Sequence, residues 1–157
     1  HKISLIEKNA ARLGISILKA EQRSASEFDP ALEAQFDLVI ADVPCSGLGV
    51  IRKKPDIRYK DPEPLTGLPA VQSAILDNAA GYVKPGGVLV YSTCTILERE
   101  NRAVTDAFLA AHPEFRRESF LLPGPAGEVS GGQITLWPQV HGTDGFYICK
   151  LRKDGEA

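Results

Sequence analysis

The sequence predicts an α/β fold in which helices pack on a doubly wound, largely parallel sheet. Two short apolar runs, at residues 36–42 and 88–93, are rich in β-branched residues and are typical of strands buried on both faces. Stretches with helical spacing of apolar residues separate these runs and follow the second one. A chain of 157 residues is long enough to build one such domain, residues 1–157, around a single core.

The chain opens with a predicted helix. Ile3, Ile6, Ala10 and Leu13 recur at helical spacing, and Gly14 follows in a position that a helix C-cap prefers. The ranges predicted next are a strand at 15–20, a loop with a helical turn at 24–35, and the strand at 36–42.

A long loop is predicted after the strand at 36–42. The segment from Pro44 to Pro69 is rich in proline and glycine, so it is expected to form an active-site loop rather than a regular element. Apolar residues with helical period then predict a helix at 71–83, and a Lys-Pro-Gly-Gly turn at 84–87 leads into the strand at 88–93.

The last third of the chain is predicted to contain one helix and several short strands. Thr95 and Glu98 have the spacing of a capping box, which would open a helix that continues to about Ala111. The remaining predicted ranges are a strand at 115–122, a loop at 123–133, and an antiparallel hairpin of strands at 134–137 and 145–151.

Composition favours a globular cytoplasmic protein with no membrane partner. The net charge is −2, no run reaches the roughly eighteen apolar residues of a membrane span, and the first residues do not resemble a signal peptide. Three cysteines, an odd number, argue against a disulfide framework. The three histidines are scattered and no C-x-x-C pair exists, so no metal site is expected.

Two cysteines follow the two best-defined strands. Cys45 comes just after the run at 36–42, and Cys94 comes just after the run at 88–93. Because ligands bind at the carboxyl ends of strands in an open α/β sheet, both thiols are expected at one rim, together with Asp42 and the rigid Pro44. This combination predicts a reaction centre. Cys149 alternates with aromatic residues inside a predicted strand and is expected in the core.

The long loop carries a local excess of positive charge. Its basic residues surround a single acidic residue, Asp56, and are Arg52, Lys53, Lys54, Arg58 and Lys60. Such a cluster is suited to contact the phosphates of a nucleic acid, although solvated lysines and arginines are also ordinary on any loop. Tyr59 and Trp137 are candidates for stacking on bases.

The motifs around the two cysteines resemble a known family. The string D-V-P-C-S-G at 42–47 and the string S-T-C at 92–94 are similar to the paired motifs of the Sun/Fmu family of RNA cytosine-5 methyltransferases. The similarity extends over nearly the whole chain, through G-V-I-R at 49–52, K-P-D-I-R at 54–58, K-P-G-G at 84–87 and D-G-F-Y at 144–147. The resemblance implies methyl transfer from S-adenosylmethionine to C5 of a cytosine in RNA, with ribosomal RNA as the expected substrate.

The resemblance also implies roles for the residues at the rim. C5 of cytosine is not nucleophilic until a thiolate adds to C6, so the reaction requires covalent catalysis. The resemblance assigns this attack to Cys94 and the release of the adduct to Cys45, and it places Asp42 near N3 of the cytosine ring. The alternative for either cysteine is a small buried core residue.

A seven-stranded methyltransferase sheet with an antiparallel final strand is the implied fold, but the sequence lacks the part expected to hold most of the cofactor. No G-x-G-x-x-G pattern is present, so the chain is expected to be the C-terminal portion of the catalytic domain, without its first two strands. The implied contacts with S-adenosylmethionine are Asp42, Pro44 and Ser24. The family usually has an aspartate where Ser24 stands, and Glu21 or Asp29 are the alternatives in this sequence.

Two consequences and two alternatives follow from the missing strands. We expect the isolated chain to be inactive alone and to pair its exposed sheet edge, either by joining the strand at 15–20 to the strand at 36–42 or by forming a homodimer. The alternative functions are a non-catalytic remnant that binds RNA or protein, and a thiol redox protein.

Overall fold

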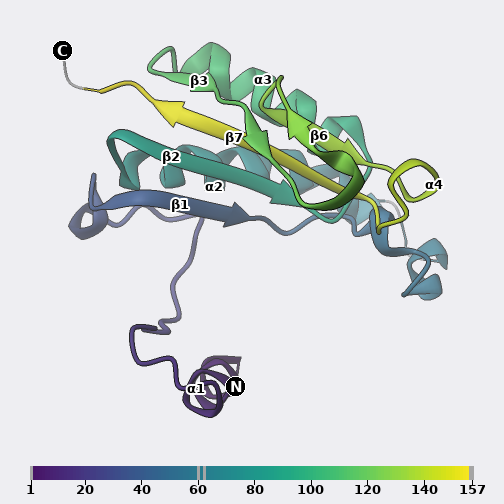
Figure 1. Ribbon diagram of the computed structural model, residues 1–157, viewed down its shortest axis with the longest axis horizontal. Helices are drawn as coiled ribbons and strands as arrows, with labels where there is room; N and C mark the ends of the chain where they lie inside the picture. Colours follow the sequence, from purple (N-terminus) through teal and green to yellow (C-terminus); the bar gives the residue numbers. More distant parts are fainter. Residues whose placement is uncertain (1, 60, 62, 156–157) are drawn as a thin grey trace.

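A mixed five-stranded sheet forms the centre of the molecule, as the computed structural model in Figure 1 shows for residues 2–59, 61 and 63–155. The strand order is β1-β2-β7-β3, and β6 also pairs with β7. β1 is parallel to β2, whereas the other pairs are antiparallel. The strands are β1 (Phe36–Asp42), β2 (Val83–Thr93), β3 (Phe115–Arg117), β6 (Gln133–Leu136) and β7 (Phe146–Lys153).

Two helices, α2 (Leu68–Tyr82) and α3 (Arg102–Ala111), cover one face of this sheet (Figure 1). Alternate residues of the strands point toward them, and the core includes the fully buried Leu89, Cys149 and Leu151. Full burial of each leucine stabilises the fold by about 1.5–3 kcal/mol. The α/β class and the antiparallel C-terminal strand are confirmed, and so is the core position of Cys149.

The opposite face of the sheet is largely open. Leu38 and Ile40 on β1 are 53% and 64% exposed. Leu38 lines a shallow hollow of about 420 Å³ together with side chains of β2 and β7 and with Phe120 and Leu122. Within the described residues β1 pairs only with β2, so its outer edge is unpaired as well as apolar.

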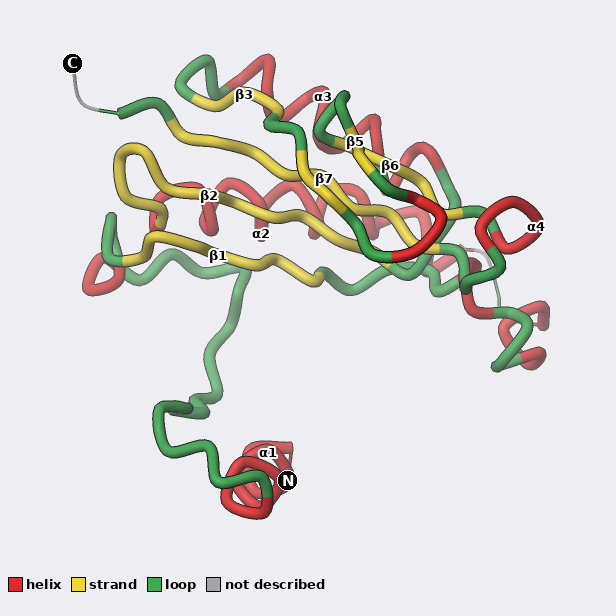
Figure 2. The backbone as a smooth tube through the Cα atoms, in the orientation of Figure 1, coloured by secondary structure: helices red, strands yellow, loops and turns green. Residues whose placement is uncertain are grey.

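The predicted strand at 15–20 is wrong. These residues form a loop, drawn in green in Figure 2, and Ile17 is 95% exposed. A strand needs a hydrogen-bonding partner, and no segment of the described chain supplies one to residues 15–20. The helix before it, α1 (Lys2–Arg12), is confirmed, with Gly14 at a φ of +70°, but it lies apart from the sheet (Figure 1).

The predicted start of the helix at Thr95 is also wrong. The α-helix begins at Arg102, after a 3₁₀ turn, η5 (Glu98–Glu100). Thr95 is fully buried and its Oγ1 accepts from the backbone N–H of Leu97, so Glu98 forms no capping box with it. Its hydroxyl also contacts Ser46, which ties it to the opposite loop.

The remaining elements are short. The turn at 84–87 lies inside β2, where Gly86 has a φ of +74°, and the predicted strand at 115–122 is divided into β3 and β4. The other short elements are β4 (Phe120–Leu121), β5 (Glu128–Val129), α4 (Pro138–His141), η1 (Pro30–Leu32), η2 (Leu48–Val50), η3 (Pro55–Tyr59), η4 (Glu63–Gly67) and η6 (Gly124–Ala126). Among the described segments, no helix has the length and apolar character needed to cross a membrane.

Candidate active site

The parallel strands β1 and β2 end at the same edge of the sheet (Figure 1), with Asp42 opposite Ser92 in the register. Their loops bring the two cysteines together, and Cys45 Sγ lies 3.2 Å from Cys94 Sγ. Both side chains are partly exposed, so a reactant can reach them from solvent. The structure thus brings into contact two free thiols that are separated by 49 positions in the sequence.

Three loops are held tightly at this edge. The backbone N–H of Gly49 donates to the carbonyl of Cys94 at 3.0 Å, and the N–H of Gly145 donates to the carbonyl of Gly49 at 2.8 Å. A Cβ on Gly49 would lie 2.0 Å from the carbonyl oxygen of Gly145, so only glycine fits there. These contacts place the entry to β7 directly beside the cysteine loops.

The environment of Cys45 favours its protonated form. Burial, followed by the hydrogen bond with Cys94, raises the pKa of the Cys45 thiol to about 12. Cys45 is therefore protonated at neutral pH, and it shares a hydrogen bond with Cys94 in which either sulfur can be the donor.

Replacing Cys94 with alanine is expected to lower the pKa of Cys45. The substitution removes the hydrogen-bonding partner and leaves burial as the main cause of the raised value. The measurement is the rate of alkylation of Cys45 by iodoacetamide as a function of pH, followed by mass spectrometry of the Cys45 peptide. The midpoint of the curve should move to lower pH. An unchanged midpoint with a faster rate would mean that only access to the thiol had changed.

The two thiols open into a cavity of about 570 Å³. Besides the cysteines, its lining includes Lys53, Lys54, Asp56 and Ile57. The loop predicted from its prolines and glycines thus forms one wall of the space in front of the sulfurs. A planar base that enters this space would lie between the thiols and a basic loop.

Asp42 and Pro44 line an adjacent cavity of about 240 Å³ rather than the one in front of the thiols. Asp42 is exposed, and its Oδ1 accepts a hydrogen bond of 3.0 Å from Ser92 Oγ. Ala25 and Tyr82 line this cavity and also a third one, so the two hollows are neighbours.

Ser24 lines the third cavity, which has a volume of about 520 Å³. Phe28 and Tyr82 line it as well and stack with their ring centroids 5.2 Å apart. Of the two alternatives to Ser24, Asp29 lines the same cavity, whereas Glu21 lines a different hollow and pairs with Lys19 and Arg23.

The basic cluster carries less free charge than its sequence predicts. Lys53 Nζ lies 2.6 Å from Asp144 and Arg52 lies 3.7 Å from it, so one carboxylate faces both cations. Within the described part of the chain, no carboxylate forms an ion pair with Lys54 or Arg58, which are exposed. Lys60 lies outside the described residues.

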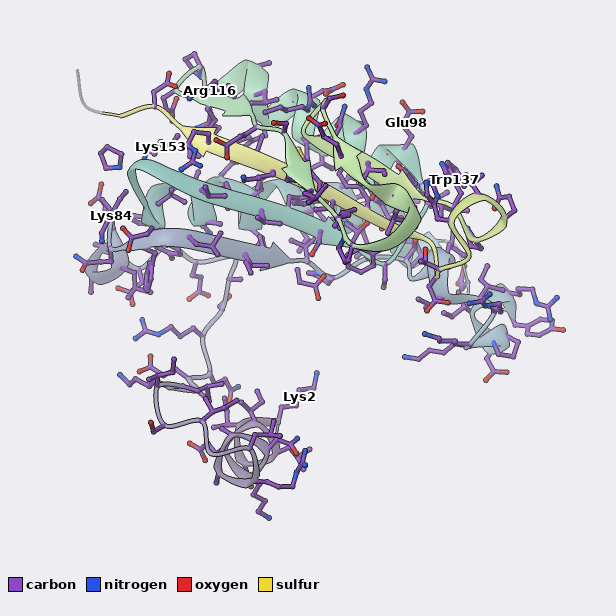
Figure 3. All side chains as sticks on the ribbon, in the orientation of Figure 1. Lys2, Lys84, Glu98, Arg116, Trp137 and Lys153 are labelled. Atoms are coloured by element: carbon purple, nitrogen blue, oxygen red, sulfur yellow. The ribbon has the colours of Figure 1, made fainter. Side chains whose placement is uncertain are left out.

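Both candidate stacking residues are accessible near this loop. Tyr59 is highly exposed at the end of η3, and Trp137 lies toward the same end of the molecule (Figure 3). A nucleic-acid strand lying along this end could stack a base on one of these aromatic rings while the basic loop contacts a phosphate.

Several buried polar residues around the cysteines were not predicted. Glu100 and Asn101 hold the two cysteine loops, and Gln72 on α2 reaches the same network. Hydrophobic periodicity gives no signal for such residues, and the helix predicted from Thr95 would have placed Glu100 in its interior. Among the described residues, no group of three or more potential ligands forms a metal site.

The sequence matches a known protein family over nearly its whole length. The family described as 16S rRNA methyltransferase RsmB/F matches residues 1–152. The chain belongs to this family. The matched range includes both of the motifs that bring Cys45 and Cys94 to one rim.

Curated relatives are longer than this chain. A Bacillus subtilis protein described as a probable ribosomal RNA small subunit methyltransferase B is 44% identical over 161 residues, which is 99% of this chain and 36% of the relative. Ribosomal RNA small subunit methyltransferase F of Escherichia coli is 35% identical over 157 residues, covering 97% and 33% of the two chains. The chain thus spans about a third of the length of these relatives and matches their C-terminal part.

Solved structures share the fold. The crystal structure of PH0851 has a TM-score of 0.83 at 34% identity, over 96% of this chain and 34% of that one. The structure of NSun6 from Pyrococcus horikoshii with SFG has a TM-score of 0.70 at 28% identity, over 96% of this chain and 38% of that one.

Proposed function

We propose that residues 1–157 are the C-terminal portion of the catalytic domain of an RNA cytosine-5 methyltransferase that acts on ribosomal RNA. The observation that carries the proposal is the pair of thiols 3.2 Å apart at the carboxyl end of two parallel strands. Membership of the RsmB/F family and the names of the relatives support an RNA substrate.

Two thiols in contact provide what this reaction needs. Cys94, as a thiolate, forms a bond to C6 of cytosine, and the displaced electron pair makes C5 nucleophilic. After C5 has been methylated, Cys45 releases its thiol proton to solvent, and the resulting thiolate takes the C5 proton. The electron pair left behind restores the C5–C6 double bond and breaks the bond between C6 and Cys94.

Part of a cofactor site is present. When bound, S-adenosylmethionine supplies the methyl group. The two neighbouring cavities fit one side of such a molecule, because Phe28 and Tyr82 offer flat apolar surfaces and Asp42 and Ser24 offer hydrogen-bond acceptors. The similarity to NSun6, solved with the S-adenosylmethionine analogue SFG, supports this assignment.

The isolated chain is proposed to be inactive alone. It contains no glycine-rich cofactor-binding turn of the G-x-G-x-x-G type, and Ser24 cannot supply the carboxylate that the family uses at that position. The same two features favour the second candidate, a non-catalytic remnant that binds RNA. A methyl-transfer assay on a completed domain distinguishes the two candidates.

The test uses a chimera in which residues 1–157 replace the matching third of the Bacillus subtilis relative. The substrate is small-subunit ribosomal RNA labelled with tritium at C5 of cytosine and incubated with S-adenosylmethionine. Cytosine-5 methylation releases the tritium to water as methyl groups are incorporated. Incorporation without tritium release would place the methyl group on another atom, and neither event would favour the non-catalytic remnant.

RNA binding by the loop is expected to depend mainly on Lys54 and Arg58. Their joint replacement by alanine should weaken binding and reduce the slope of log affinity against log salt by about 0.7–0.9 for each phosphate that the loop no longer neutralises. Joint replacement of Arg52 and Lys53 should change the slope less, because Asp144 already faces both side chains. Filter binding over a range of salt concentrations measures the slopes. If both double variants and the wild type gave equal slopes, the loop would be an ordinary solvated surface that does not bind RNA phosphates.

A further inference from the structure

A buried pair of neighbouring residues, Glu100 and Asn101, lies directly behind the two cysteines. Both side chains are buried, at 0% and 1% exposure, and they sit where η5 ends and α3 begins. Their polar atoms are not used to cap the helix, since Asn101 occupies the N-cap position without a side-chain capping bond. Each side chain instead contacts one of the cysteine loops.

Glu100 holds the loop that carries Cys45. Its Oε2 accepts hydrogen bonds from the backbone N–H of Ser46 at 2.8 Å and from Gln72 Nε2 at 3.1 Å. The same Gln72 nitrogen donates to the carbonyl of Pro44 at 3.0 Å. The residue before Cys45 and the residue after it are therefore both attached to the Glu100–Gln72 pair, so the turn cannot rotate without breaking buried hydrogen bonds.

Asn101 holds the loop that carries Cys94 in the same manner. Its Oδ1 accepts from Thr93 Oγ1 at 2.6 Å, and its Nδ2 donates to the carbonyl of Thr95 at 3.0 Å. These bonds again lie on either side of the cysteine. A hydrogen bond of 2.8 Å between Ser46 Oγ and Thr95 Oγ1 then links the two loops to each other.

Burying a carboxyl group is unfavourable unless hydrogen bonds compensate, and one oxygen, Glu100 Oε1, has no partner among the described residues. An apolar residue at this position would avoid that cost but would leave the buried N–H of Ser46 without its acceptor. The buried carboxyl group therefore fixes the turn around Cys45. We propose that Glu100 and Asn101 are positioning residues, which clamp the Cys45 and Cys94 loops so that the two sulfurs face each other in contact.

The inference rests on the proposed roles of the two cysteines, but its test does not require methyl transfer. Dibromobimane becomes fluorescent when it links two neighbouring thiols, and each thiol displaces one bromide as hydrogen bromide. Its rate of bridging Cys45 to Cys94 in the 157-residue chain reports the relative placement of the sulfurs. Dividing this rate by the rate of single alkylation with iodoacetamide removes differences in access.

Glu100→Ala is expected to lower the normalised bridging rate about tenfold, because small displacements of reacting groups slow intramolecular reactions strongly. Glu100→Gln keeps an acceptor oxygen for Ser46 and Gln72 and should restore the rate to within about twofold of the wild type. Thr105→Val is the matched control. Thr105 is equally buried on α3, and the hydrogen bonds that its side chain forms with described residues go to Arg102, Tyr147 and Arg117 rather than to a cysteine loop.

Circular dichroism and thermal unfolding establish that each variant is folded. If Glu100→Ala does not fold, Asn101→Asp tests the proposal instead. This substitution keeps the acceptor for Thr93 and loses the donor to Thr95, so the bridging rate should fall severalfold. A folded Glu100→Ala or Asn101→Asp variant that bridges at the wild-type rate overturns the proposal. So does a Thr105→Val variant that loses bridging to the same degree. Failure of the tritium-release assay with normal bridging results would reject the proposed function and leave the clamp standing.

Discussion

Replacing Cys94 with alanine in the chimeric enzyme is expected to abolish methylation, whereas replacing Cys45 is expected to trap the protein on its RNA. Without Cys94 no bond to C6 forms, so the rate should fall by about 10⁴-fold or more. Without Cys45 the bond forms, but the C5 proton stays and the adduct accumulates. A denaturing gel after incubation with ribosomal RNA and S-adenosylmethionine separates the outcomes, because only the trapped species migrates as a covalent complex.

The third cysteine provides the matched control for this experiment. Cys149 is fully buried on β7, and in the register it lies opposite Tyr91 inside β2 rather than at the strand ends. Cys149→Ser should leave both methylation and the gel pattern qualitatively unchanged. A retarded band with Cys94→Ala, and none with Cys45→Ala, would reverse the two assignments.

The proposed roles of the two thiols rest on the resemblance of their motifs to those of the family, since the side chains are chemically identical. The structure adds that the sulfurs are in contact and share a hydrogen bond. Burial also holds the proton on Cys45 by raising the pKa of its thiol.

The meeting of the two cysteines could be predicted from the sequence because it depends on local patterns. Each cysteine follows a β-branched run, and parallel strands end at one edge, so β1 and β2 sufficed to place both thiols. The failures involve interactions between distant segments. Residues 15–20 have the composition of a strand but find no partner in the described chain, and Thr95 has capping-box spacing but is buried against Ser46.

The same limitation applies to the charges and buried polar groups of the site. Asp144 lies far beyond Lys53 in the sequence, and only the close approach of Gly145 to Gly49 brings its carboxylate to the basic loop. Glu100 looks like an ordinary charged residue near a helix start. Its burial against the turn after Cys45 is a property of the assembled loops, which no local pattern encodes.

The isolated 157-residue chain is expected to associate with itself through the outer edge of β1. This strand has no partner on that side among the described residues, and its Leu38 and Ile40 are more than half exposed. Pairing with a second copy would satisfy the edge hydrogen bonds, and burial of each of these side chains would contribute roughly 1 kcal/mol. Sedimentation velocity should therefore show a dimer or larger species whose population grows with concentration.

Replacing both Leu38 and Ile40 with lysine should shift this equilibrium to the monomer, because charged side chains on an edge strand oppose pairing. Both side chains are exposed, so the fold should survive the change. Val140→Lys is the control, since Val140 is 69% exposed on α4, away from the edge of β1. A wild-type chain that is monomeric at every concentration contradicts the expected association. Equal dissociation by Val140→Lys would instead locate the contact elsewhere on the surface.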